Sequence, residues 1–310
     1  MKQYAIAIIL SATAALAAAQ GRILPITEMP SSPETLAAGN AAHAPSESFL
    51  YSTPGAVFHS PNRWHAAYSA ALLPANDGTH SMHTLAAATR LGHNAFFLGG
   101  RYHAMGALHT FVDNNMNETS HDKLPLYAYT VDGGYARMFS PHLSAWATAG
   151  FASEHTATTI NAFRAGIGAD YAGQTALGRG QLNYKAGLSA TNLGGYSYTG
   201  HSGMLSPRIG VGGHTAWLMA PGQTLALTID GGLYMKTDDS KQSTELSGGF
   251  AYTAFSRYTL RVGGHTGDHD DYAAAGLSVA LKGFTINAAT TIPLHKDMDA
   301  IYMAGLTFEL

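Results

Sequence analysis

The stretch "QLNYKAGLSATN", Gln181 to Asn192, decides the fold. Successive side chains of a β-strand point to opposite faces, so strict alternation of apolar and polar residues predicts a strand between two different environments. One face takes Leu182, Tyr184, Ala186, Leu188 and Ala190, and the other takes Asn183, Lys185, Gly187, Ser189 and Thr191. This stretch therefore predicts a strand with one apolar face and one polar face.

The same alternation recurs in about fourteen segments between Arg63 and the end of the chain. Charged residues in mid-segment fall on the polar parity, and an isolated buried charge is costly. The polar faces must therefore meet in an interior that is wet or in which charges are paired. The charges on this parity are Arg164, Asp170, Lys185, Arg208, Asp230, Glu245 and Arg261.

The connections between the segments alternate between long or polar ones and tight turns such as "GH", "APGQ" and "KG". Long loops on one rim and short turns on the other are typical of bacterial outer-membrane barrels. The exception is "AGQTALGRG", Ala172 to Gly180, which reads as a long connection where a short turn is due. A soluble β-sandwich is the alternative, but it would not explain this alternation. The sequence predicts an all-β, transmembrane, antiparallel outer-membrane barrel of about fourteen strands.

Three segments divide the chain. Residues 1–19 combine Lys2, an apolar stretch and an Ala-rich end before Gln20, which predicts a cleaved export signal. Residues 20–62 precede the first strand and predict a plug-like segment, and residues 63–310 predict the barrel. We therefore expect the cell outer membrane of a Gram-negative bacterium, with membrane lipid as the surrounding partner.

Composition further narrows the functions that the chain could have. Charged residues make up 12% of the chain, the formal net charge is -3, and cysteine is absent. A nucleic-acid partner, disulfides and cysteine chemistry are therefore not expected. The chain has no nucleophile elbow and no metal-spaced pair such as H-E-x-x-H, so we expect no enzyme, no cofactor and no metal site.

The chain ends in "MAGLTFEL", an amphipathic strand. A barrel has to close, because backbone groups in lipid must be paired, so this last strand should pair with the first. Gly305, Phe308 and Leu310 resemble the terminal signal that the barrel assembly machinery reads. Replacing Phe308 and Leu310 with Ser is therefore expected to impair assembly.

One short motif resembles FadL-type barrels in general, and two others resemble the PorV/PorQ branch of the FadL-like barrels. Thr53-Pro54-Gly55 fits the bend of the FadL-type entry segment. Asn192-Leu193-Gly194 fits a turn after a strand, and Leu205-Ser206-Pro207 fits the Leu-Pro entry into the next strand.

This resemblance implies a barrel that binds, shuttles or anchors proteins in type IX secretion, with the C-terminal domains of secreted cargo or other secretion components as partners. The binding region would be the longest predicted loop, Met105 to Pro125, because binding residues concentrate on loops. The alternative is a FadL-like transporter of hydrophobic small molecules, with a plugged lumen and a side opening. The loop residues expected to contact a partner are Asn114, Asn115, Asn117, Glu118, His121 and Asp122.

Overall fold

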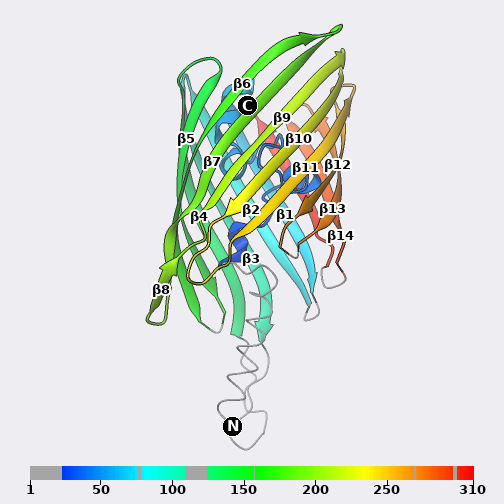
Figure 1. Cartoon of the computed structure of the whole chain (residues 1–310). Helices are drawn as coiled ribbons and strands as arrows, with labels where there is room; N and C mark the ends of the chain where they lie inside the picture. Colours follow the sequence, from blue (N-terminus) through cyan, green and yellow to red (C-terminus); the bar gives the residue numbers. More distant parts are fainter. Residues whose placement is uncertain (1–22, 76–77, 109–123, 157, 269, 296–298) are drawn as a thin grey trace, which may run out of the picture.

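The computed structural model describes residues 23–75, 78–108, 124–156, 158–268, 270–295 and 299–310. Fourteen antiparallel strands close into a barrel, and a short fifteenth, β8, pairs with β7 (Figure 1). The predicted all-β barrel is confirmed. The strands are β1 (Trp64–Ala75), β2 (Gly78–Leu91), β3 (Asn94–Leu108), β4 (Leu124–Met138), β5 (Leu143–His155), β6 (Thr159–Leu177), β7 (Gly180–Tyr198), β8 (His201–Met204), β9 (Arg208–Ala220), β10 (Gln223–Tyr234), β11 (Ser243–Ala254), β12 (Tyr258–Thr266), β13 (Tyr272–Leu281), β14 (Phe284–Pro293) and β15 (Tyr302–Glu309).

The first and last strands seal the barrel, as the sequence predicts. β1 and β15 pair from His65 with Glu309 to Leu72 with Tyr302. The backbone N–H of Leu310 also donates to the carbonyl of Trp64 at 3.0 Å. The ring of strands therefore has no open edge at its ends.

Tight turns join the strands at the rim that holds the C-terminus (Figure 1, top). Several of these turns contain a glycine with positive φ, such as Gly92 and Gly283, because two-residue hairpin turns favour that conformation. The long connection predicted at Ala172 to Gly180 is wrong. β6 runs on to Leu177 and β7 starts at Gly180, because these small and polar residues extend the β6–β7 ladder beyond β5.

Residues 23–62, which we call the lumenal segment, lie inside the barrel (Figure 1, blue). They contain η1 (Pro25–Thr27), α2 (Pro33–Ala37), η2 (Phe49–Tyr51) and η3 (Pro54–His59). α2 starts with a capping box, in which the Ser32 side chain accepts the N–H of Thr35 at 3.2 Å. Within the described ranges, no helix is long and apolar enough to cross a membrane.

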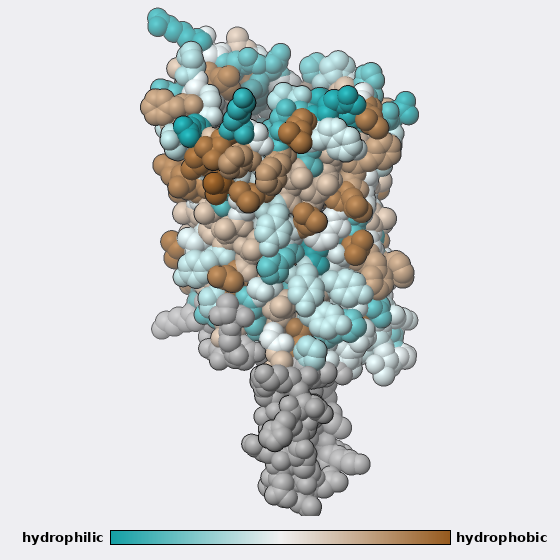
Figure 2. Space-filling model, turned by 180° about the vertical axis from the view of Figure 1, so that it is seen from behind, coloured by the Kyte–Doolittle hydropathy of each residue, from teal (hydrophilic) through white to brown (hydrophobic). Residues whose placement is uncertain are grey.

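The outer wall carries the large apolar side chains that the sequence places on the other parity. Leu98, Phe163 and Leu188 are each at least 65% exposed. Figure 2 shows apolar side chains gathered on the wall below its upper rim, where hydrophilic ones are concentrated. The wall therefore presents an apolar surface outside and a polar one inside.

Candidate functional site

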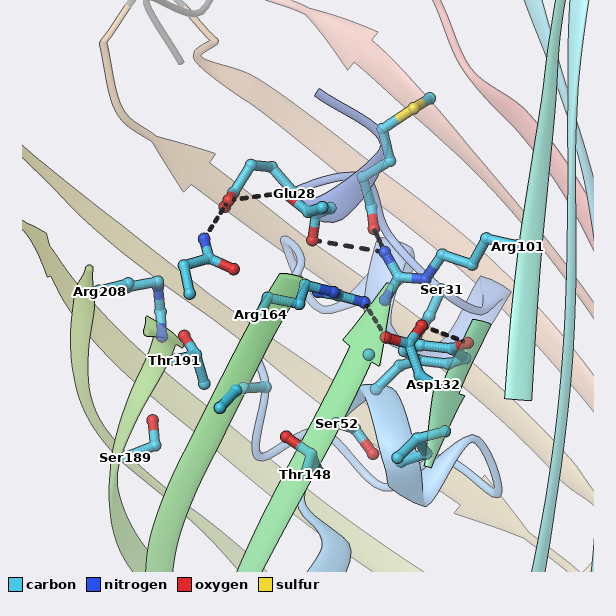
Figure 3. A pocket seen from close by; sticks show the side chains of 18 of the residues that line it. Glu28, Ser31, Ser52, Arg101, Asp132, Thr148, Arg164, Ser189, Thr191 and Arg208 are labelled. Carbon is cyan, nitrogen blue, oxygen red and sulfur yellow. Dashed lines mark hydrogen bonds and ion pairs between the residues drawn. The ribbon is translucent and has the colours of Figure 1, made fainter. Parts of the chain in front are cut away.

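A chamber of about 160 Å³ lies between the lumenal segment and the inner wall of the barrel (Figure 3). Most of its lining side chains are polar or charged, and they come from both sides of this boundary. We call this space the chamber. It is lined by Thr27, Glu28, Met29, Ser31, Thr35, Asn40, Ala42, Leu50, Tyr51, Ser52, Arg101, Asp132, Trp146, Thr148, Ala149, Gly150, Arg164, Ala165, Ser189, Thr191, Asn192, Arg208, Tyr234 and Glu245.

Arg101 on β3 holds the lumenal segment at one side of the chamber. Its side chain is buried, and Nη1 donates to the carbonyls of Ile26 at 2.9 Å and Met29 at 3.2 Å. The guanidinium carbon also lies 4.0 Å from the centroid of the Tyr51 ring, a cation–π geometry. Its Nε has no hydrogen-bond acceptor among the described residues.

The carboxylate of Asp132 on β4 accepts hydrogen bonds from an arginine of the wall and a tyrosine of the lumenal segment. Arg164 Nη2 donates to it at 2.8 Å, and the Tyr51 hydroxyl donates at 3.0 Å. Burial raises the pKa of Tyr51 well above its ordinary value, with the Asp132 charge adding to the effect, so this hydroxyl keeps its proton. A Cβ at Gly150 would overlap the Asp132 carboxylate, so the glycine makes room for it.

Glu28 of the lumenal segment occupies the opposite side. Asn192 Nδ2 donates to its Oε1 at 2.6 Å, and the Tyr234 hydroxyl donates to its Oε2. Beside it, Arg208 Nε donates to Glu245 Oε1 at 2.6 Å. Both carboxylates of this side are therefore already engaged by protein donors.

The formal charges that line the chamber cancel, with three guanidinium groups facing three carboxylates. Among the lining residues, the buried side-chain atoms that lack a partner are the Nε groups of Arg101 and Arg164. Both atoms have almost no accessible surface, so neither faces the open space of the chamber. The charged residues are Arg101, Arg164, Arg208, Glu28, Asp132 and Glu245.

A second polar site, which we call the clamp, consists of His43, Asp170 and Asp230. The backbone N–H of His43 donates to Asp230 Oδ2 at 3.1 Å, and His43 Nδ1 hydrogen-bonds Asp230 Oδ1. On the other side, His43 Nε2 lies 3.8 Å from Asp170 Oδ1. Trp146 Nε1 donates to Asp170 Oδ2 at 3.0 Å. The clamp thus joins the lumenal segment to β6 and β10.

The wall around the clamp is shaped to accept the imidazole ring. A Cβ at Gly187 on β7 or at Gly212 on β9 would overlap the ring of His43 and a neighbouring carboxylate. Lys185 lies near enough to both carboxylates to interact with them electrostatically. Glycine at these two positions therefore lets a histidine fit between two wall strands.

The predicted inward parity of the mid-strand charges is confirmed. Asp170 and Asp230 meet in the clamp, while Arg208 and Glu245 form an ion pair. Arg261 lies apart from both sites and donates to Ser278. Arg208 and Glu245 are therefore paired with each other, whereas Asp170, Asp230 and Arg261 are held by other polar side chains of the lumen.

The motif Thr53-Pro54-Gly55 lies at the start of η3, next to the clamp. Thr53 Oγ1 donates to the carbonyl of Ala42 at 2.8 Å, which fixes the residue before His43. A Cβ at Gly55 would overlap the Asp170 carboxylate. This bend therefore packs against the residues that hold the lumenal segment.

Asn192-Leu193-Gly194 does not form the predicted turn, because it lies inside β7. Asn192 has φ of 55°, and the β7–β9 ladder ends at the pair Thr191 and Arg208. Beyond this point β7 pairs with β8, starting at Gly195. The motif is a kink at which β7 leaves β9, and it places Asn192 in the chamber.

The remaining predicted positions support the wall. Leu205 is buried in a cluster with Leu24, and the carbonyl of Pro207 accepts the N–H of Met235 at 2.8 Å. At the end of the chain, Phe308 is 46% exposed and Leu310 is 80% exposed on the outer face. A Cβ at Gly305 would instead meet Pro33 of the lumenal segment. Recognition of these last residues by the assembly machinery stays a prediction.

The six residues predicted to bind a partner and the export signal 1–19 lie outside the described residues. The structure therefore gives no geometry for either prediction. The ends of the predicted loop are strands instead, because Met105 to Leu108 belong to β3 and Leu124 to Pro125 belong to β4. The loop residues concerned are Asn114, Asn115, Asn117, Glu118, His121 and Asp122.

Sequence reasoning missed four residues of these sites. Arg101 and Asp132 occupy inward positions of β3 and β4, so the parity rule that found the other charges could have found them. Glu28 and His43 carry no such signal, because the lumenal segment has no regular period that would indicate which side chains face the wall.

No family model matches the chain, and no curated protein matches it. Solved structures do resemble it. The P. putida toluene transporter TodX has a TM-score of 0.62 and 10% identity over 90% of this chain and 98% of that one. The Ralstonia pickettii toluene transporter TbuX has a TM-score of 0.59 and 12% identity over 90% and 98%. The CymD monoaromatic hydrocarbon channel has a TM-score of 0.61 and 10% identity over 91% and 98%.

At these identities the comparison establishes the fold. The chain shares its barrel fold with these toluene transporters and this hydrocarbon channel. The narrower assignment to the PorV/PorQ branch is not shown by these likenesses.

Proposed function

We propose that the chain is an outer-membrane channel for small molecules in which the lumenal segment acts as a plug. The observation that carries this proposal is the position of the chamber. Asn192 lines the chamber and also marks the point at which β7 leaves β9. On the other side of β7, the register of β6 shifts between Ala165 and Ile167, and Ala165 lines the chamber as well.

The chamber lies beside an interruption in the pairing of the wall strands. Such an interruption suits a side opening in the barrel wall. A molecule held in the chamber would leave near Asn192, between the end of the β7–β9 ladder at Thr191 and the start of the β7–β8 ladder at Gly195. One backbone hydrogen bond, from the Leu205 N–H to the carbonyl of Gly194, lies between the two ladders. The apolar outer face supports a location in the membrane, since a lipid-exposed wall must be apolar. Export through residues 1–19 remains a prediction.

The ligand class has its first support in the similar structures. The similar proteins include toluene transporters and a monoaromatic hydrocarbon channel. A compact apolar or amphipathic molecule is therefore the starting hypothesis for this chain. The similar proteins are transporters and channels, which also favours a binding and transport role over catalysis.

The role in type IX secretion that the PorV/PorQ resemblance implied has no support in the described geometry. The loop proposed to capture partner proteins lies outside the described residues. We therefore prefer the small-molecule channel, which was the alternative at the level of sequence.

Filling the chamber tests the channel. Ser189 lines the chamber, and its neighbour Leu188 is 65% exposed on the outer wall. Ser189→Trp should block passage, whereas Leu188→Trp adds the same ring on the lipid side and should not. The measurement is uptake of radiolabelled toluene and radiolabelled benzoate by Gram-negative cells with and without the protein.

We expect the wild-type protein to accelerate uptake of one or both probes, Ser189→Trp to abolish the gain, and Leu188→Trp to retain it. Heat-modifiability on gels establishes that each variant is a folded barrel. Uptake of both probes at the rate of cells without the protein would contradict the channel function.

A further inference from the structure

Two copies of the triplet His-x-Met lie on neighbouring strands of the wall. His80-Ser81-Met82 belongs to β2 and His103-Ala104-Met105 belongs to β3, and no other histidine of the chain is followed by methionine at this spacing. Residues two apart in a strand point to the same face. His80, Met82, His103 and Met105 are each at most 9% exposed, and none of them lines the chamber. We call these four side chains the His–Met patch.

The pairing of β2 with β3 arranges the His–Met patch as a square. Met82 lies directly opposite His103 in the antiparallel register, and His80 and Met105 follow on their strands towards the same rim. The rings of the two histidines lie across the diagonal, with 6.0 Å between their centroids. Met82 and Met105 belong to one buried cluster. Diagonal neighbours in a sheet are within reach of long side chains, so two imidazoles and two thioethers share one small area of the wall.

The Nε2 atom of His103 lacks a partner. It is buried and has no hydrogen bond among the described residues. Buried polar atoms almost always have a partner, because burying one without compensation is unfavourable. The atom has almost no accessible surface, so it does not face an open space that holds a solute. A metal ion meets this need differently, because the ligand atoms of a closed metal site surround the ion and are withdrawn from water.

The kinds of side chain in the His–Met patch select the ion. Thioether sulfur is a soft ligand that favours Cu(I), and imidazole also binds copper. Imidazole binds metals in its neutral form, so all four ligands would be uncharged. Within the described ranges, no three His, Cys, Asp or Glu side chains gather closely enough to hold a metal ion, so no carboxylate adds a negative charge. Burying a singly charged ion here is therefore less costly than burying a divalent one.

Arg101, the neighbouring inward residue of β3, favours the same choice. Its guanidinium is directed into the chamber (Figure 3), where Nη1 donates to the carbonyls of Ile26 and Met29. The repulsion between this guanidinium and a bound cation grows with the charge of the cation. The position of Arg101 thus also disfavours Zn(II) relative to Cu(I).

We propose that the His–Met patch binds one Cu(I) ion, with His80, Met82, His103 and Met105 as its ligands. This site is separate from the chamber and goes beyond the channel function. A search for metal motifs within a single element does not find it, because each strand supplies only half of the ligands and the register of β2 with β3 brings the halves together.

Titration with Cu(I) under anaerobic conditions tests the site in the purified, detergent-solubilised full barrel. Competition with the chelator bicinchoninate measures the stoichiometry and the affinity. We expect one tightly bound Cu(I) per barrel, which an equal concentration of Zn(II) does not displace. X-ray absorption at the copper edge should show both sulfur and nitrogen atoms bound to the ion.

Two double variants locate the site. Met82→Leu with Met105→Leu removes both thioethers while nearly conserving side-chain volume, so the barrel should still fold. Affinity for Cu(I) should fall at least about tenfold, because even changes to residues around metal ligands lower affinity by that factor. Met138→Leu with Met235→Leu removes two thioethers far from the patch in the chain and should leave the affinity unchanged. Heat-modifiability on gels shows which variants are folded barrels.

Four results would overturn the assignment: no Cu(I) retained against the chelator, bound copper without sulfur neighbours, equal losses in the two double variants, or displacement of Cu(I) by an equal concentration of Zn(II). The absorption measurement uses the wild-type protein, so it decides the question even where a variant does not fold. None of these measurements involves uptake of a solute, so failure of the copper site and failure of the channel function are distinguishable.

Discussion

The chamber and the clamp lie in the same lumen and use the same kinds of side chain in opposite ways. In the clamp, the ring of His43 faces a carboxylate on each side, and two glycines of the wall leave room for that ring and little more. In the chamber, the side chains of Arg101 and Arg164 extend toward one another across an open space. The difference shows that the inward charged side chains of this barrel do two things. They hold the lumenal segment at the clamp, and they line an open space at the chamber.

Removing a carboxylate from the clamp should destabilise the protein most. Asp230→Ala deletes the acceptor of both the backbone N–H and the ring of His43. Breaking a buried pair by removing one partner costs about 3–5 kcal/mol. We expect the barrel to remain heat-modifiable while residues 23–62 become accessible to protease.

The exposed rim residue Asp238 supplies the control, because Asp238→Ala removes the same charge from a solvated position. Equal protease resistance of residues 23–62 in the Asp230 variant and the wild type would show that the clamp does not hold the segment.

Neutralising a carboxylate of the chamber should lower the free energy of unfolding by a smaller amount. Asp132→Asn weakens the ion pair with Arg164, but water in the chamber can replace part of the lost interaction. We expect thermal unfolding to show a loss of about 1–2 kcal/mol, near the value of a single charged hydrogen bond. A loss as large as that of Asp230→Ala would mean that the chamber is as dry and as tightly packed as the clamp.

Replacing Glu34, a charged residue that belongs to neither region, should change the free energy of unfolding least. This replacement should raise the free energy of unfolding, whereas the other two should lower it. Burial raises the pKa of Glu34 above its ordinary value of 4.5, although the nearby Arg261 opposes this shift. The folded state then keeps a proton that the unfolded chain releases, so the free energy of unfolding falls as pH rises from 4.5 through the folded pKa.

Glu34→Gln removes this dependence and should stabilise the protein by about 1 kcal/mol at pH 8, with little effect at pH 4. Thermal unfolding across pH measures the difference, and Asp238→Asn serves as the exposed control. A stabilisation that is the same at both pH values would show that it does not come from ionisation of Glu34.

Much of the barrel could be predicted from the sequence because strand alternation is a local property. The period of two residues identified the inward charges, and the amphipathic last strand indicated closure. The errors at Ala172–Gly180 and Asn192–Gly194 share a cause, since small and polar residues were read as loops. The β6–β7 ladder in fact runs through the first stretch and includes Leu193 and Gly194 of the second.

The two sites could be predicted only in part, because they depend on contacts between residues far apart in the chain. His43 and Asp230 are separated by 187 positions, and Asn192 and Glu28 by 164. Such pairs follow from the path of the lumenal segment through the barrel. That path is set by fitting side chains to the wall, and no periodic pattern in residues 23–62 encodes it.

The pairing of β1 with β15 has a kinetic consequence. Most neighbouring strands are joined by short connections, so their ladders form with little loss of chain entropy. The seal between His65 and Glu309 instead joins the two ends of the barrel sequence, and it carries the slow, non-local step of folding. Residues 23–62 lie directly ahead of β1 and pack inside the finished ring, so we expect their docking to be coupled to that seal. The pairing of β1 with β15 is therefore expected to be the last step of barrel closure.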